Sequence, residues 1–302
     1  MRLGRKPAAR DGENHAIWPV LTRATASNPQ PDTAAALAGL GELRAICKSP
    51  DAFLAWALRL LALHRSVVIQ QRLQETMGTS VQSGPFTGMR LRGHSREGGQ
   101  VPKLLGCYEA DLHGEWERVV RRDYATVVNV GCADGYYAVG LARRMPRTRI
   151  LAYDSDSEAR QSCGELAELN GVADRIEIRG SFTGKEFAAL PAADVFVICD
   201  IEGYERELLD PARFPRLKGM DLLVEMHDLA AARTDRLLRE RFVGTHTFSR
   251  VDATLGARKL PVAFAEQDEL DRLLAVWEWR IEPTPWAIML AREDHERRRE
   301  DR

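Results

Sequence analysis

The sequence has little that points to a secreted, metal-stapled or membrane-spanning protein. Its five cysteines are scattered and form no C-x-x-C pair, which argues against a disulfide framework and against a zinc site. The longest apolar stretch, AFLAWALRLLALH from Ala52, is interrupted by Arg59 and is too short and too charged to predict a bilayer-spanning helix. No apolar segment follows the basic N-terminus, so no secretory signal is expected. These absences predict a cytoplasmic protein with reduced thiols and no membrane partner.

The sequence also lacks an excess of charge of either sign. It has 43 Lys and Arg residues against 44 Asp and Glu residues, a formal net charge of −1, which gives no electrostatic reason to expect a nucleic-acid partner. Its 302 residues are 44% hydrophobic and 29% charged, which is ordinary globular composition. The length fits one large domain or two smaller ones.

The composition and residue pattern of the chain change along its length. Residues 1–33 are polar and rich in proline, and we expect a flexible arm there. Residues 34–85 are rich in Ala and Leu at helical spacing, with Ser49 and Pro50 as a helix start signal, and predict a helical cap or dimerisation segment. Residues 86–295 carry the alternating strand and helix pattern, and residues 296–302 are a charged tail.

Seven short runs typical of strands follow one another in the larger segment, most of them separated by helical stretches: ATVVNV, RILAY, RIEIR, DVFVIC, LLVEM, THTFSRV and PWAIMLA. Strands joined by crossover helices predict a parallel sheet covered on both faces. We therefore expect an α/β fold: a doubly wound, mostly parallel, seven-stranded Rossmann-like sheet with an N-terminal helical extension. Ligands of such sheets bind at the carboxyl ends of the strands.

The first of these strands ends in NVGCADG, residues 129–135. Gly131 and Gly135 allow a sharp turn at a helix start, but Ala133 breaks the G-x-G-x-x-G pattern, and no phosphate-binding G-x-x-x-x-G-K-[ST] occurs. The second strand ends in LAYDSD, which places Asp154 about twenty residues after the turn, where a carboxylate can accept hydrogen bonds from ribose hydroxyls. This combination predicts a nucleoside-containing cofactor.

VVNVGCADGYYAVGLA and LAYDSD resemble the first and second motifs of class I S-adenosylmethionine-dependent methyltransferases. GCYEADLH, CDIEGYERELL and LLVEMHD more narrowly resemble the FkbM-like members of that class. The similarity covers roughly residues 100–230. It departs from the family pattern at Asn129, where an acidic residue is common, and at Ala133, where glycine is common.

The resemblance implies S-adenosylmethionine as the cofactor and a role for each matching residue. The methionine and ribose portions would lie against the turn, the ribose hydroxyls against the acidic motif, the adenine against the loop after the third strand, and the sulfonium against the end of the fourth strand. The residues so implied are Glu109, Asn129, Gly131, Ala133, Gly135, Asp154, Ser155, Ser181, Phe182 and Asp200. Phe182 has a core position as an equal alternative.

The acceptor side is predicted from strand ends and alternation. Asp200 follows the fourth strand, and Glu225 and His227 end the fifth on one face of it, so the three residues are the predicted catalytic set. His227 is the expected general base, with a structural imidazole as the alternative. A second alternative is a metal site made by the same three side chains, with Mg²⁺ as the ion, and a third is a site that works by aligning donor and acceptor alone.

The sequence thus predicts an enzyme that methylates a small-molecule acceptor, and the resemblance favours a hydroxyl of a sugar or natural product. Transfer to nitrogen or carbon on the same fold is a near alternative. A non-catalytic protein that binds S-adenosylmethionine and an NAD-dependent dehydrogenase are the more distant ones. A homodimer formed through the N-terminal helices is the expected protein partner.

Overall fold

The computed structural model describes residues 12–25, 32–93, 95, 98–227, 233–254, 264, 267–282 and 284–292. The chain forms two compact units. The helical unit comprises Met1–Ala110 and Gly256–Glu282, and the sheet unit comprises Asp111–Leu255 and Pro283–Arg302. The helical unit therefore continues past residue 85, and it takes in a later segment that the sequence pattern had placed with the strands.

The sheet unit is built on one seven-stranded sheet in the order β3-β2-β1-β4-β5-β7-β6. The strands β1 to β5 run parallel, and β7 is antiparallel to both of its neighbours. The expected doubly wound, mostly parallel sheet is confirmed. The strand bounds are β1 Thr126–Val130, β2 Arg149–Tyr153, β3 Ile176–Arg179, β4 Val195–Cys199, β5 Asp221–Glu225, β6 His246–Val251 and β7 Trp286–Ala291.

The register of the parallel strands brings their carboxyl ends to one edge. Val130, the last residue of β1, pairs with Tyr153 at the end of β2 and with Cys199 at the end of β4. Cys199 in turn pairs with Val224 of β5. Because the strand order reverses between β1 and β4, this edge contains the switch point at which ligands of open α/β sheets bind.

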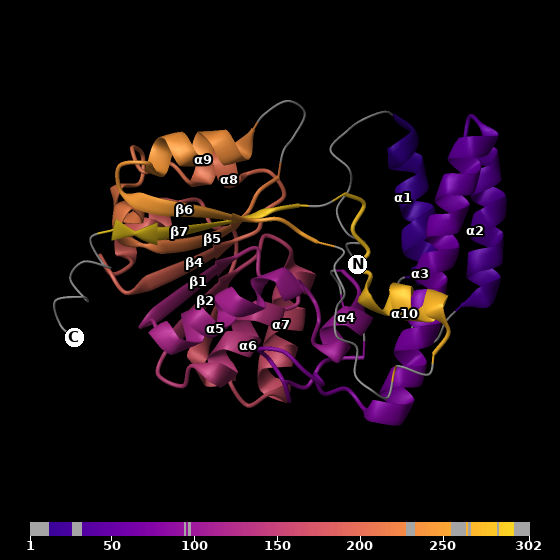
Figure 1. The fold of residues 1–302 in the computed structure, drawn as a ribbon, viewed down its shortest axis with the longest axis horizontal. Coiled ribbons are helices and arrows are strands. Elements are labelled where there is room, and N and C mark those ends of the chain that lie inside the picture. Colours follow the sequence, from indigo (N-terminus) through magenta and orange to yellow (C-terminus); the bar gives the residue numbers. More distant parts are fainter. Residues whose placement is uncertain are drawn as a thin grey trace. The chain divides into compact units, whose positions relative to one another are not determined.

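Helices cover both faces of the sheet (Figure 1). One face carries α5, α6 and α7, and the other carries α8 and α9. The bounds are α5 His113–Arg122, α6 Tyr136–Arg144, α7 Ser157–Leu169, α8 Glu205–Leu208 and α9 Thr234–Phe242, with short 3-10 turns at η1 Ala110–Leu112, η2 Ala173–Arg175, η3 Lys185–Ala189 and η4 Pro215–Gly219. The coverage explains why β1, β4 and β5 are buried along their whole length.

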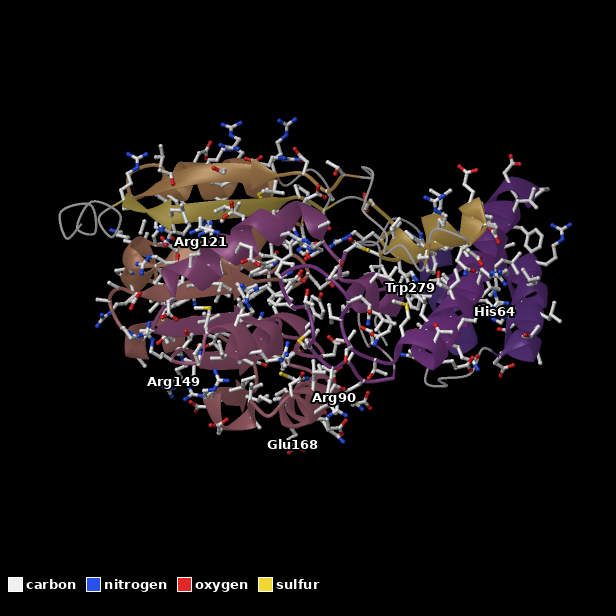
Figure 2. All side chains as sticks on the ribbon, turned by 60° about the horizontal axis from the view of Figure 1, so that its bottom comes forward. His64, Arg90, Arg121, Arg149, Glu168 and Trp279 are labelled. Carbon is white, nitrogen blue, oxygen red and sulfur yellow. The ribbon has the colours of Figure 1, made fainter. Side chains whose placement is uncertain are left out.

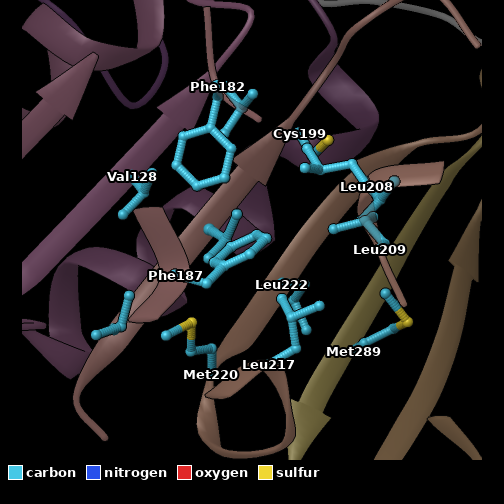
Figure 3. Close-up of a cluster of buried hydrophobic side chains, with 14 of the residues drawn as sticks. Val128, Phe182, Phe187, Cys199, Leu208, Leu209, Leu217, Met220, Leu222 and Met289 are labelled. Carbon is cyan, nitrogen blue, oxygen red and sulfur yellow. The ribbon is translucent and has the colours of Figure 1, made fainter. Parts of the chain in front are cut away.

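A large apolar core fills the space between the sheet and the helices α8 and α9 (Figure 3). Val128, Leu222 and Met289 come from three strands, Phe187 comes from η3 and Leu208 comes from α8. Full burial of a side chain of this size contributes about 1.5–3 kcal/mol. This layer holds the strand ends in fixed positions. At the opposite, amino-terminal edge, Arg149 of β2 pairs with Glu177 at 2.5 Å and lies on the surface (Figure 2).

The helical unit contains five helices within its described residues: α1 Gly12–Thr25, α2 Thr33–Ile46, α3 Pro50–Met77, α4 Gln100–Leu105 and α10 Glu269–Val276. The expectation of a flexible arm over residues 1–33 is wrong for α1. Ile17, Val20 and Leu21 of α1 are almost fully buried against α2 and α3, and this burial stabilises a helix that contains Pro19. That expectation is also wrong for Asp32 and Thr33, which begin α2, and residues 1–11 and 26–31 lie outside the described ranges.

Helix α3 begins as the sequence predicts, with the Ser49 hydroxyl accepting a hydrogen bond from the Ala52 N–H at 3.1 Å. It is longer than the apolar stretch suggested. Its 28 residues include an 18-residue window of mean hydropathy 1.6, which is long and apolar enough to cross a membrane by length and composition, a test that core helices also pass. Two arginines of α3 bind other segments of the helical unit. Arg59 donates to the carbonyl of Trp279, which Figure 2 labels, at 2.5 Å, and Arg65 pairs with Asp271 at 2.7 Å.

Candidate functional site

The glycine turn after β1 is held tightly by neighbouring strands. The N–H groups of Gly131 and Cys132 both donate to the Tyr153 carbonyl at 2.9 Å. Gly131 has φ +81°, and a Cβ there would lie 1.8 Å from the Asp200 carbonyl oxygen. The turn is therefore in direct backbone contact with the residue that follows β4, and only glycine fits.

Gly135 is required by the packing of two helices. Its φ is +88°, and an added Cβ would lie 2.7 Å from the Cys163 sulfur on α7. Protein atoms thus occupy the space beside the Cα atom of each glycine. A ligand at the turn would therefore contact the backbone of the turn and not the space that the two glycines leave. Ala133 between them has φ 47°, a left-handed conformation that costs a non-glycine residue about 1 kcal/mol or more.

Asp154 links the end of β2 to this turn. Its carboxylate is 6% exposed, and its Oδ2 accepts the Ala133 N–H at 3.0 Å while its Oδ1 accepts the Asp156 N–H at 2.9 Å. Each oxygen of a carboxylate has a further lone pair. Asp154 is therefore held in one orientation and keeps accepting capacity for two adjacent hydroxyls. Its neighbour Ser155 is exposed.

Asn129 of β1 carries an orphaned polar atom. Its side chain is 2% exposed, and its Oδ1 has no hydrogen-bond partner. A buried acceptor without a donor costs about 1–3 kcal/mol. This position, two residues before Gly131, is thus suited to an ammonium or hydroxyl donor supplied by a ligand.

Phe182 lies in the core. Its ring is 8% exposed and makes edge contacts with Tyr153 and Phe187, each with a centroid separation of 4.8 Å (Figure 3 shows Phe182 and Phe187). The structure thus supports the core alternative for this side chain. Ser181 before it is exposed.

Glu109 belongs to the helical unit, whereas the other cofactor residues named from the sequence belong to the sheet unit. Its carboxylate accepts a hydrogen bond from Arg280, and its N–H donates to Glu278 Oε1 at 2.8 Å. Arg280 also pairs with Glu278 at 2.9 Å. Within its unit Glu109 is therefore part of a buried ion-pair network.

The three residues predicted for the acceptor side are brought together. His227 Nε2 lies 3.9 Å from Asp200 Oδ1 and 3.8 Å from Glu225 Oε2. The alternation that places Glu225 and His227 on one face also puts Met226 into the apolar core behind them. Asp228, the next residue, lies outside the described ranges.

A fourth residue, Glu205, completes the cluster. Its Oε1 lies 2.7 Å from His227 Nδ1 and also accepts the Ile201 N–H at 3.1 Å, and its side chain is fully buried. The sequence did not single it out, although it stands inside the quoted motif CDIEGYERELL. A wholly buried glutamate at the start of a four-residue helix is visible only when tertiary packing is known.

Neighbouring hydroxyls hold the cluster in place. Thr234 donates to the His227 carbonyl at 2.7 Å, and Thr284 donates to Glu225 Oε1 at 2.6 Å. The loop after β4 is itself strained, because Glu202 has φ 59° next to Gly203 at φ 102°. Strained backbone persists where surrounding contacts determine it, and it is common at functional sites.

The structure therefore supplies two adjacent sets of groups at the carboxyl edge. One is the turn with Asn129 and Asp154, and the other is the cluster of Asp200, Glu205, Glu225 and His227. The two sets meet where Gly131 lies close to the backbone of Asp200.

Comparisons with known proteins give likenesses of fold. No protein-family model matches the chain, and no curated protein matches it. Among solved structures, it is similar to the O-methyltransferase TomG from Streptomyces achromogenes in complex with SAM, with 15% identity, 63% of this chain and 83% of that chain covered, and a TM-score of 0.43. It is also similar to the O-methyltransferase from Bacillus cereus in complex with SAH (11% identity, 57% and 77% covered, TM-score 0.39) and to cofactor-bound Rv0187 from MTB (13% identity, 80% and 95% covered, TM-score 0.40). Because these TM-scores are low, a function can be argued only from the residues of the site.

Proposed function

We propose that the protein is an S-adenosylmethionine-dependent methyltransferase that acts on a hydroxyl group of a small molecule. One observation carries the proposal: the turn suited to a nucleoside cofactor touches, through Gly131, the residue that begins the acidic and imidazole cluster. A methyl donor bound at the turn would present its sulfonium toward that cluster. In-line transfer needs this proximity above all.

The residues at the turn fit the cofactor. Asp154 retains lone pairs for the two ribose hydroxyls, and the orphaned Oδ1 of Asn129 would accept a hydrogen bond from the ammonium group of the methionine portion. When bound, S-adenosylmethionine supplies an electrophilic methyl group on a positively charged sulfur. The carboxylate of Asp200, which is 17% exposed and follows β4 beside the turn, would stabilise that positive charge.

His227 is the group that takes the acceptor proton. Because the buried Glu205 carboxylate accepts the Nδ1–H, the Nε2 lone pair is left for a proton from the acceptor. Glu205 is thus a positioning residue that fixes the tautomer of the imidazole. Loss of the hydroxyl proton makes the oxygen nucleophilic enough to attack the methyl group.

The sheet does not favour the dehydrogenase alternative. Dinucleotide-binding sheets have the strand order 3-2-1-4-5-6, whereas here the antiparallel β7 lies between β5 and β6. Ala133, with φ 47°, also occupies the second glycine position of their fingerprint.

The test is transfer of an isotope-labelled methyl group from S-adenosylmethionine to a panel of sugar, polyol and phenolic hydroxyls, read by mass spectrometry. His227→Gln should lower kcat by on the order of 10²–10⁴ and leave cofactor affinity unchanged, because the imidazole is proposed to act on the acceptor and not on the cofactor. His64→Gln, a change in the helical unit, is the control. Labelling of amines instead, with full activity of His227→Gln, would favour N-methylation, and cofactor binding without any labelled product would favour a binding protein.

A further inference from the structure

The cluster around His227 has the make-up of a cation site. Asp200, Glu205 and His227 each offer one donor atom, and these atoms lie within 4.8 Å of one another. Ligand atoms about 2 Å from a common ion are roughly 3–4 Å apart, so a small contraction would bring all three into contact with it. The three side chains come from the ends of β4 and β5 and from α8, which the apolar core holds in position.

Two buried atoms of this cluster lack a partner. They are Nε2 of His227 and Oε2 of Glu205, and the side chains that carry them are 7% and 0% exposed. A buried polar group without a partner is costly, and a buried charge is more so. Since Nε2 lies 3.9 Å from Asp200 Oδ1, beyond hydrogen-bond distance, a ligand bound beside Asp200 would satisfy Nε2.

The cluster is also rich in carboxylates. Three of them, those of Asp200, Glu205 and Glu225, lie around a single imidazole. The side chains of Glu205 and Glu225 are almost entirely buried. Charges removed from water are tolerated when paired or when they coordinate a metal.

We propose that Asp200, Glu205 and His227 bind a divalent first-row transition ion of the Mn²⁺ or Zn²⁺ type. An imidazole donor together with carboxylates suits these ions, whereas Mg²⁺ and Ca²⁺ prefer ligand sets made of oxygen alone. The donor set thus differs from the sequence-based one, with Glu205 as a ligand in place of Glu225 and with an ion other than Mg²⁺. Three protein ligands leave coordination positions open.

This inference deepens the proposed function and rests on it, because the ion would act in the proposed methyl transfer. An acceptor oxygen in an open position of the ion would lose its proton more readily, which is the task assigned to His227 when the cluster holds no ion. Proton and ion compete for the same imidazole lone pair. Binding of the ion requires neither S-adenosylmethionine nor acceptor, so it can be measured separately.

The experiment is a calorimetric titration of the full chain, dialysed against chelator and free of cofactor, with Mn²⁺, Zn²⁺ and Mg²⁺ alone. We expect one Mn²⁺ or Zn²⁺ per chain with much weaker Mg²⁺ binding, and a rise in the melting temperature on adding Mn²⁺, since a ligand that binds only the native state stabilises it. Glu205→Gln and His227→Gln should each weaken binding at least about tenfold. Glu207→Gln, which removes an exposed carboxylate from the same short helix, should leave it unchanged.

Asp200→Asn, at the most exposed of the three positions, serves if the buried variants fail to fold, and it should lose the same tenfold. Absence of Mn²⁺ and Zn²⁺ binding, or binding that these variants do not weaken, would overturn the metal site. Either result would leave methyl transfer as proposed, because that is measured by labelled product. Conversely, metal binding without labelled product would support the site and count against the proposed reaction.

Discussion

At the scale of single residues, the most informative side chains are those fixed before any ligand arrives. Asp154 is held by two backbone N–H groups, and His227 is held through Glu205 at its Nδ1. Side chains held in this way lose little conformational entropy on binding, so their remaining acceptor atoms are effective ligands. Both hold an orientation suited to their proposed role.

Replacing Asp154 with Ala should weaken S-adenosylmethionine binding by about 1.5–3 kcal/mol, roughly ten- to 150-fold, because hydrogen bonds to a carboxylate are lost. Calorimetry measures the change. Asp156→Ala is the matched control: Asp156 caps α7 by accepting the Glu158 N–H, so its loss should cost about 1 kcal/mol of stability and no cofactor affinity. Equal affinity in the wild type and Asp154→Ala would remove the ribose role.

The residues of the site could be predicted only in part, for a physical reason. Asp200, Glu225 and His227 follow buried strands, whose apolar runs and alternation are visible in the sequence, and the structure brings them together. Glu205 and Phe182 depend on how loops fold back over the sheet. No periodicity signals that a glutamate is fully buried beside a histidine 22 positions later.

At the scale of elements, the turn between β1 and α6 depends on close backbone contact. Gly131→Ala should destabilise the protein by roughly 3 kcal/mol or more, because the new Cβ meets the Asp200 carbonyl in addition to the cost of a positive φ. Gly171→Ala isolates the second effect, since Gly171 has φ +66° and nothing within 4 Å of the added Cβ. It should cost about 1 kcal/mol in urea unfolding. Equal losses in the two variants would contradict the close approach.

Strand β6 should make stability depend on pH through His246. Burial lowers the pKa of His246 below its ordinary value, against the opposing effects of the Met220 carbonyl and Asp221, while Arg292 lowers it further. The unfolded chain therefore binds the proton first as pH falls below about 6.5, so the stabilising contribution is present above that pH and is lost on acidification. Between pH 7.5 and 5.5, urea unfolding should show a larger loss for wild type than for His246→Gln. A parallel loss in both proteins would assign the effect to other groups.

The strands were predictable and α1 was not, because different forces set them. Strands β1, β2 and β4 are mostly apolar runs, and apart from Arg149 at the start of β2 they are buried, so their expected bounds differ from the observed ones by at most one residue. Helix α1 contains a proline and has weak local preference, and it is stabilised by burial of Ile17 and Leu21 against α2 and α3. Tertiary packing decides such a segment.

At the scale of the whole molecule, the exposed apolar stripe of α3 is expected to mediate self-association. Leu54, Leu58 and Leu61 are 62%, 71% and 46% exposed at helical spacing. We expect a homodimer by sedimentation equilibrium, and Leu58→Glu should shift it to monomer because a charge would be buried in the interface. Leu270→Glu, at a leucine of α10 that is 62% exposed, is the control. A wild-type monomer at tens of micromolar would contradict the expectation.

The carboxyl edge of the sheet is the proposed site for S-adenosylmethionine, and its most direct test is a calorimetric titration of the full chain with S-adenosylmethionine, S-adenosylhomocysteine and NAD⁺. We expect one molecule of either sulfur-containing nucleoside to bind per chain and NAD⁺ not to bind, with the affinity for S-adenosylmethionine reduced in Asp154→Ala. Binding of NAD⁺ in place of S-adenosylmethionine, or binding of none of the three, would contradict it.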